Sequence, residues 1–135
     1  MSTELYIQGY SLAGEDGLES VAVLEIFGIE PQPDGSTFFS LEYDAENSCE
    51  LSIQESDGKA TAITVIRPCG HERFWTAVFN LLRNGPYIAF MPGIPAPFVV
   101  NAEVVNHLPE GIVDALGNPK HVSTVSEIMS QILGE

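Results

Sequence analysis

Residues 49–67, CELSIQESDGKATAITVIR, constrain the fold more than any other part of the chain. Apolar and polar side chains alternate on both sides of Asp57-Gly58, a dipeptide typical of the tight turn of a β-hairpin. Residues 37–43, TFFSLEY, alternate in the same way and add a third strand. The sequence therefore predicts an antiparallel meander that buries one face and exposes the other to water.

A strand and a helix are predicted ahead of this meander. Residues 3–10, TELYIQGY, alternate enough for a strand. Residues 16–27 suit either type of element, because their branched and aromatic side chains also fit a strand. Asp16 and Glu19 are spaced as in a capping box, and Gly28 stands where a helix commonly ends. We therefore predict a helix over residues 16–27.

The second half of the chain contains the clearest helix. Residues 71–86, HERFWTAVFNLLRNGP, carry apolar side chains at helical spacing, and Asn84-Gly85 before a proline predicts a left-handed cap. Two short strands, YIAFM and FVVN, are expected on either side of the turn PGIPAP. Two more helices are predicted, PEGIVDALG and TVSEIMSQIL, the latter capped by Thr124, with KHVSTV between them as a last strand or an extended link.

This succession of hairpin-linked strands and separate helices predicts an α+β fold, with a mostly antiparallel sheet and helices packed on one face. A chain of 135 residues can bury about two-thirds of its surface. No long linker divides it, so residues 1–135 are expected to form a single acidic domain. The order of elements resembles that of small acidic secretion chaperones, which act as dimers, and this resemblance covers element order alone.

Charge is the most distinctive property of the composition. The formal net charge is −14, and residues 1–66 contain thirteen acidic residues but only one basic residue, Lys59. Such a field repels nucleic acid and anionic membrane surfaces, and it attracts a basic protein. The charge is also compatible with an acidic surface that serves solubility alone.

The meander carries the candidate binding residues. If its strands pair as predicted, six carboxylates gather along its loop and outer face, where they form an acidic recognition surface for a basic protein or an ordinary solvated sheet face. The candidates are Glu42, Asp44, Glu46, Glu50, Glu55 and Asp57. From them we predict a non-catalytic binding module, similar to an inhibitor, an immunity protein or a chaperone.

The alternative function rests on Cys69 and His71. A thiol at a helix N-terminus has a lowered pKa, so Cys69 with a histidine would suit a small enzyme or a small-ligand-binding protein. The structural interpretation is that a helix begins here and Cys69 is a buried apolar residue. Histidine two positions away rarely aligns with a thiol, and nothing in the sequence brings His107 or His121 nearby. These residues are therefore weak catalytic candidates, and a non-enzymatic function is favoured.

No cofactor or metal is predicted. The spacing of cysteines and histidines fits no zinc pattern, and neither a phosphate-binding loop nor a dinucleotide fingerprint occurs. The first residues, MSTELYIQGY, do not resemble a signal peptide, and no apolar run is long enough to span a membrane. We therefore expect a cytoplasmic protein, in which Cys49 and Cys69 are free thiols.

An uncharged apolar segment predicts association. Residues 86–100, PYIAFMPGIPAPFVV, contain no charged side chain. The prolines of the turn PGIPAP belong at a surface, which would leave Ile94 and Pro95 exposed. A homodimer or another hydrophobic contact at this tip would cover them.

Overall fold

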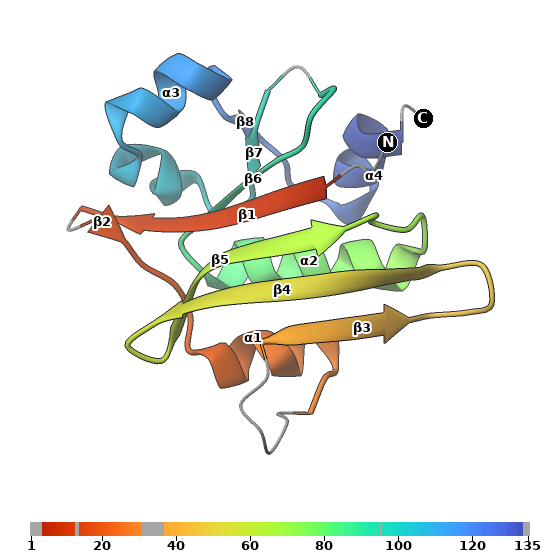
Figure 1. Cartoon of the computed structure of the whole chain (residues 1–135). Coiled ribbons are helices and arrows are strands. Elements are labelled where there is room, and N and C mark those ends of the chain that lie inside the picture. Colours follow the sequence, from red (N-terminus) through yellow and green to blue (C-terminus); the bar gives the residue numbers. More distant parts are fainter. Residues whose placement is uncertain (1–3, 13, 31–36, 95, 134–135) are drawn as a thin grey trace.

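The computed structural model describes residues 4–12, 14–30, 37–94 and 96–133. It consists of a mixed, mostly antiparallel sheet with helices, which confirms the predicted α+β class (Figure 1). The strands are β1 Glu4–Ser11, β2 Gly14–Glu15, β3 Phe38–Glu42, β4 Ser48–Ser56, β5 Lys59–Ile66, β6 Tyr87–Phe90, β7 Phe98–Val99 and β8 Lys120–His121. The helices are α1 Ser20–Phe27, α2 Glu72–Asn84, the 3-10 helix η1 Ala102–His107, α3 Glu110–Leu116 and α4 Val125–Leu133.

The sheet is built around its first strand. Its order is β3-β4-β5-β1-β6-β7-β8, so β1 pairs with β5 on one side and β6 on the other, and only β7 and β8 are parallel. The predicted meander of β3, β4 and β5 is confirmed. At its second turn Asp57 and Gly58 have φ angles of 53° and 78°, the positive values that a type I′ hairpin turn requires.

The main core lies between one face of the sheet and the helices α1, α2 and α4. Alternate side chains of each strand point into it, and α2 contributes Phe74 and Trp75, both fully buried. A second, smaller core lies on the opposite face, where Val104 of η1 packs against Ile88 of β6 and Val99 of β7. The long helices thus cover one face as predicted, and η1 with α3 adds a cover over β6 and β7 on the other.

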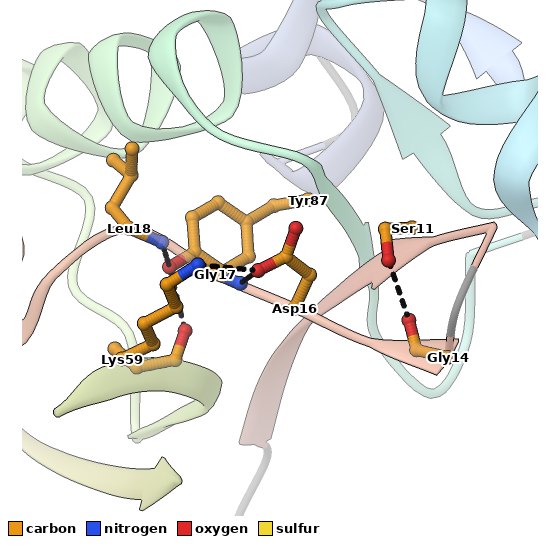
Figure 2. A network of polar contacts seen from close by, with 8 residues as sticks. Ser11, Gly14, Asp16, Gly17, Leu18, Lys59 and Tyr87 are labelled. Carbon is orange, nitrogen blue, oxygen red and sulfur yellow. Dashed lines mark hydrogen bonds and ion pairs between the residues drawn. The ribbon is translucent and has the colours of Figure 1, made fainter. Parts of the chain in front are cut away.

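Tyr87 joins three segments that are distant in the sequence (Figure 2). Its buried hydroxyl donates a hydrogen bond to the carbonyl oxygen of Ala60, 2.6 Å away, and accepts one from the N–H of Leu18, 2.9 Å away. Two glycines leave room for it: a Cβ on Gly17 would overlap the carbonyl oxygen of Ala60, and a Cβ on Gly85 would overlap the Tyr87 ring. The β1–α1 connection, the start of β5 and β6 are therefore held together by one side chain.

Two predicted helix ends differ from the structure. α1 begins at Ser20, so Asp16 does not cap the helix as the predicted capping box requires. Its carboxylate accepts the N–H of Gly17 and pairs with Lys59 at 3.4 Å. Gly85 is extended, with φ −121° and ψ 172°, so the predicted left-handed cap of α2 is wrong. Here glycine is required by the close approach of the Tyr87 ring rather than by its own dihedral angles.

The other helix ends follow the prediction. Gly28 ends α1 in the left-handed conformation, with φ 72°. Thr124 caps α4, because its hydroxyl oxygen accepts the N–H of Glu127 at 3.1 Å. Within KHVSTV, Lys120 and His121 form the short strand β8. The sequence interpretation missed β2 and η1, both of which are short.

Candidate functional site

One face of the meander and of the first part of β1 is open, on the side of the sheet opposite the main core. In Figure 1, α2 lies behind β4 and β5, and none of the coloured elements lies in front of them. The side chains that alternate with the buried ones on these strands are half-buried or exposed. We call this surface the open face. Its residues are Glu4, Tyr6, Phe38, Ser40, Glu42, Glu50, Ser52, Thr64, Ile66 and, from β6, Phe90.

An aromatic and hydroxyl row crosses the middle of the open face. The strand registers place Phe38 opposite Ser52, Ser52 opposite Thr64, and Thr64 opposite Tyr6. Tyr6 is in turn paired with Phe90, and their rings stack with centroids 5.2 Å apart. Phe38, at the edge of the sheet, is 50% exposed. The row therefore crosses five strands, with aromatic side chains on β3, β1 and β6 and hydroxyl side chains on β4 and β5 between them.

Acidic side chains flank this row. Glu4 accepts a hydrogen bond from the Tyr6 hydroxyl at 2.6 Å, and this bond, more than any other cause, raises the pKa of Tyr6. Glu50 lies on β4 and forms an ion pair with Arg67 at 2.8 Å. Glu42, at the end of β3, is exposed. The open face thus combines an apolar centre with carboxylates beside it.

The six predicted binding residues do not form one cluster. Glu42, Asp44 and Glu46 lie at the turn between β3 and β4, whereas Glu55 and Asp57 lie at the opposite end of β4. A nine-residue strand spans about 27 Å at roughly 3.3 Å per residue. The carboxylates are therefore spread along the whole length of β4, with Glu50 on its outer face between the two groups.

Sequence reasoning missed three carboxylates at the hairpin end of β4. Glu15, Asp16 and Glu19 line two hollows of about 270 and 380 Å³ together with Asp57 and Lys59. They precede or begin α1, and the isolated bridge between Glu19 and Lys59 brings them to the hairpin. The excess of acids in residues 1–66 was the available signal, but pairing distant in sequence decided where they meet.

Asp44 has a structural role in addition to its charge. Its carboxylate accepts the N–H groups of Glu46 and Asn47 and the side-chain amide of Asn47, each at 2.9 Å. These hydrogen bonds, led by that from the Asn47 side chain, lower the pKa of Asp44. Asp44 therefore shapes the turn that presents Glu42 and Glu46.

Cys69 and His71, the residues of the enzymatic alternative, both make structural contacts at the start of α2. His71 is the N-cap of α2: its Nδ1 accepts the N–H of Arg73 at 3.1 Å, its Nε2 lies 3.8 Å from Asp44, and its ring stacks on Tyr43. Cys69 precedes the cap, is only 8% exposed, and belongs to the main core. Its carbonyl oxygen accepts the indole N–H of Trp75 at 2.8 Å.

The other two histidines lie elsewhere. His121 is on β8, at the far end of the sheet from the meander, and its Nε2 is 2.9 Å from the carbonyl oxygen of Val100. His107 ends η1, on the side of the sheet opposite the main core. Within the described ranges, no three cysteine, histidine or acidic side chains come together to hold a metal ion. Among these same residues, no helix has both the length and the hydropathy of a membrane span.

The predicted apolar tip is only partly described. Pro95 lies outside the described residues. Ile94 is half-buried and packs against the main core, so its expected exposure is wrong. It also lines a mainly apolar hollow of about 310 Å³ with Ala115 and Leu116 at the end of α3. Association through this region stays a prediction.

No protein-family model, no curated protein and no solved structure matches this chain, so the functional conclusion depends on the chemistry of its own surface.

Proposed function

We propose that this chain is a non-catalytic, cytoplasmic binding module that presents its open face to a basic protein partner. The observation that carries the proposal is the open face itself, in which half-exposed Phe38 and the stacked rings of Tyr6 and Phe90 lie in one row with carboxylates along β4 and beside it. Inhibitors, immunity-type proteins and dedicated chaperones are all modules of this kind. Each covers a surface of another protein.

Charge complementarity supports a basic partner. The described residues form ion pairs at Asp16, Glu50 and Asp44, whereas Glu42, Glu46, Glu55 and Asp57 are exposed and take part in none of them. Carboxylates at the rim of an interface accelerate association with a cationic partner and select against an anionic one. The acids at both ends of β4 can therefore orient a basic segment along the strand.

The aromatic and hydroxyl row supplies an apolar anchor for a partner, which the carboxylates alone do not provide. Buried aromatic side chains at the centre of an interface carry most of its binding free energy, and rim charges add specificity. The stacked rings of Tyr6 and Phe90 lie beside the Glu4 carboxylate, so an arginine or lysine seated there would meet both a ring face and an anion. The partner is therefore expected to carry cationic side chains on an apolar stem.

The test compares two variants that each remove three negative charges. The first, Glu42→Gln/Glu46→Gln/Glu55→Gln, neutralises exposed acids at the two ends of β4. The control, Glu103→Gln/Glu110→Gln/Asp114→Asn, neutralises exposed acids of η1 and α3, on the cover of β6 and β7. Immobilised wild-type protein and both variants are incubated with extract from the cell of origin at low and high salt, and bound proteins are quantified by mass spectrometry.

We expect the wild type and the control to retain the same basic protein at low salt. The β4 variant should retain about tenfold less of it, since three rim charges contribute about 1–2 kcal/mol together. Higher salt should weaken binding of the wild type. Equal loss in both variants would indicate a non-specific charge effect, and the absence of any retained basic protein would contradict the proposed function.

A further inference from the structure

Two free thiols from separate segments meet in the main core. Cys49 lies on β4 opposite Leu41, with 3% of its surface exposed, and Cys69 lies in the loop before α2, with 8% exposed. In the register of β4 and β5, Glu50 pairs with Ile66, so the next residue of the chain, Arg67, follows beside Cys49. Arg67 has a positive φ of 54°, and the chain bends there as it leaves β5, two residues before Cys69.

The two cysteines belong to the same core and lie near enough for Cys69 to affect the titration of Cys49. Burial, the largest cause, raises the pKa of the Cys49 thiol to about 12; the charge and the side chain of Cys69 raise it further, whereas the backbone of Cys69 lowers it. The position of Cys69 is fixed independently, because its carbonyl oxygen accepts the indole N–H of Trp75. The fold therefore places the two thiols near each other in the main core and assigns neither to another interaction described above.

We propose that Cys49 and Cys69 form an oxidative modification site, at which a peroxide converts the two thiols into a disulfide between β4 and the loop before α2. The bridge would tie the meander to the start of α2. It would also lie close to Tyr43, at the turn that carries Asp44 and Glu46, since both thiols influence the Tyr43 hydroxyl. The site does not depend on the identity of any binding partner.

The reaction balances with hydrogen peroxide as the oxidant. Cys69, the more exposed thiol, loses its proton, and its sulfur attacks one peroxide oxygen; the O–O bond breaks and the second oxygen leaves as hydroxide, which takes up that proton. The sulfur of Cys49 then attacks the resulting sulfenic acid. The S–S bond forms, the S–O bond breaks, and the departing oxygen leaves as water with the proton of Cys49. Two thiols and one peroxide thus yield a disulfide and two waters.

A peroxide suits this site better than a disulfide reagent. Thiol–disulfide exchange requires a bulky disulfide to reach the attacking sulfur, which the burial of both cysteines opposes. A peroxide is little larger than water and needs access only to Cys69. Cys49 acts second, within the molecule, so its burial does not hinder the step.

The test follows oxidation of the reduced, folded protein by hydrogen peroxide. Free thiols are counted after denaturation, the intact mass is measured, and peptide mapping locates any bridge. We expect both thiols to disappear together, with a loss of two hydrogens in mass, a cross-linked peptide containing Cys49 and Cys69, and reversal by dithiothreitol. Trp75 is the one tryptophan of the chain and donates a hydrogen bond to the carbonyl oxygen of Cys69, so its fluorescence should change as the disulfide forms.

Single-cysteine variants and the unfolded chain provide the controls. Cys49→Ser should stop at a sulfenic acid on Cys69, which dimedone traps, and Cys69→Ala should oxidise at least about tenfold more slowly than the wild type. Oxygen addition to the wild type without loss of hydrogens would overturn the proposal. So would a disulfide that forms faster in urea than in the folded chain, or folded thiols that stay reduced when the urea-unfolded chain is oxidised.

Discussion

Replacing Gly17 with alanine is expected to destabilise the fold by about 3 kcal/mol, at the upper end of overpacking effects. The new Cβ would overlap the carbonyl oxygen of Ala60 and lie 2.9 Å from the Tyr87 hydroxyl. Ala60 cannot move at low cost, because it is paired with Glu55 in the β4–β5 hairpin and also accepts the hydrogen bond from Tyr87. The strain must therefore be relieved by separating the β1–α1 connection from the sheet.

A matched control is available in α3. Gly111 is exposed, and a Cβ built on it would meet nothing within 4 Å. Gly111→Ala should therefore change the free energy of unfolding by less than about 1 kcal/mol, in the stabilising direction, because alanine loses less backbone entropy in a helix. Urea unfolding followed by Trp75 fluorescence measures both variants. A Gly17→Ala protein as stable as Gly111→Ala would show that the segments around Tyr87 are not packed as described.

Replacing Tyr87 with phenylalanine should cost about 1–3 kcal/mol at neutral pH. The ring would keep its place, but the N–H of Leu18 would lose its acceptor and the carbonyl oxygen of Ala60 would lose a donor. The variant also alters the response to alkaline pH. Burial is the main cause that raises the pKa of Tyr87 to about 12, so folding favours the neutral phenol.

The change in stability at alkaline pH has a defined direction and a defined pH range. The stability that neutral Tyr87 contributes is fully present below the unfolded pKa of about 10, and it is lost as the pH rises through about 12. The wild type should therefore lose stability across this window, and Tyr87→Phe should lose less of it. Urea unfolding at a series of pH values measures both effects.

Tyr43 provides the control for this prediction. Burial, first among several causes, also raises the pKa of Tyr43 to about 12, but its hydroxyl makes no hydrogen bond within the described part of the chain. Tyr43→Phe should therefore flatten the alkaline loss of stability with less effect at neutral pH. If Tyr87→Phe and Tyr43→Phe behaved alike at neutral pH, the hydrogen bonds of Tyr87 would contribute nothing to stability.

The sequence by itself determined the local elements and which of their faces are buried. Alternation across Asp57-Gly58 predicted the β4–β5 hairpin, and the spacing of apolar residues after His71 predicted α2. It also favoured a buried position for Cys69. These predictions succeed because hydrophobic periodicity and turn preference depend on residues that are close together in the sequence. A short stretch of sequence therefore contains the information that decides the local structure.

Only the tertiary structure decided which of these elements meet. Insertion of β1 between β5 and β6 arranged the open face, and the length of β4 divided the predicted acidic cluster into two groups. Gly85 illustrates the reason. Its sequence context predicts a left-handed cap, yet the residue is extended and leaves room for the Tyr87 ring, which in turn bonds to Leu18 and Ala60. Contacts of this kind, like the proximity of Cys49 to Cys69, depend on packing between distant segments, which the local spacing of residues does not encode.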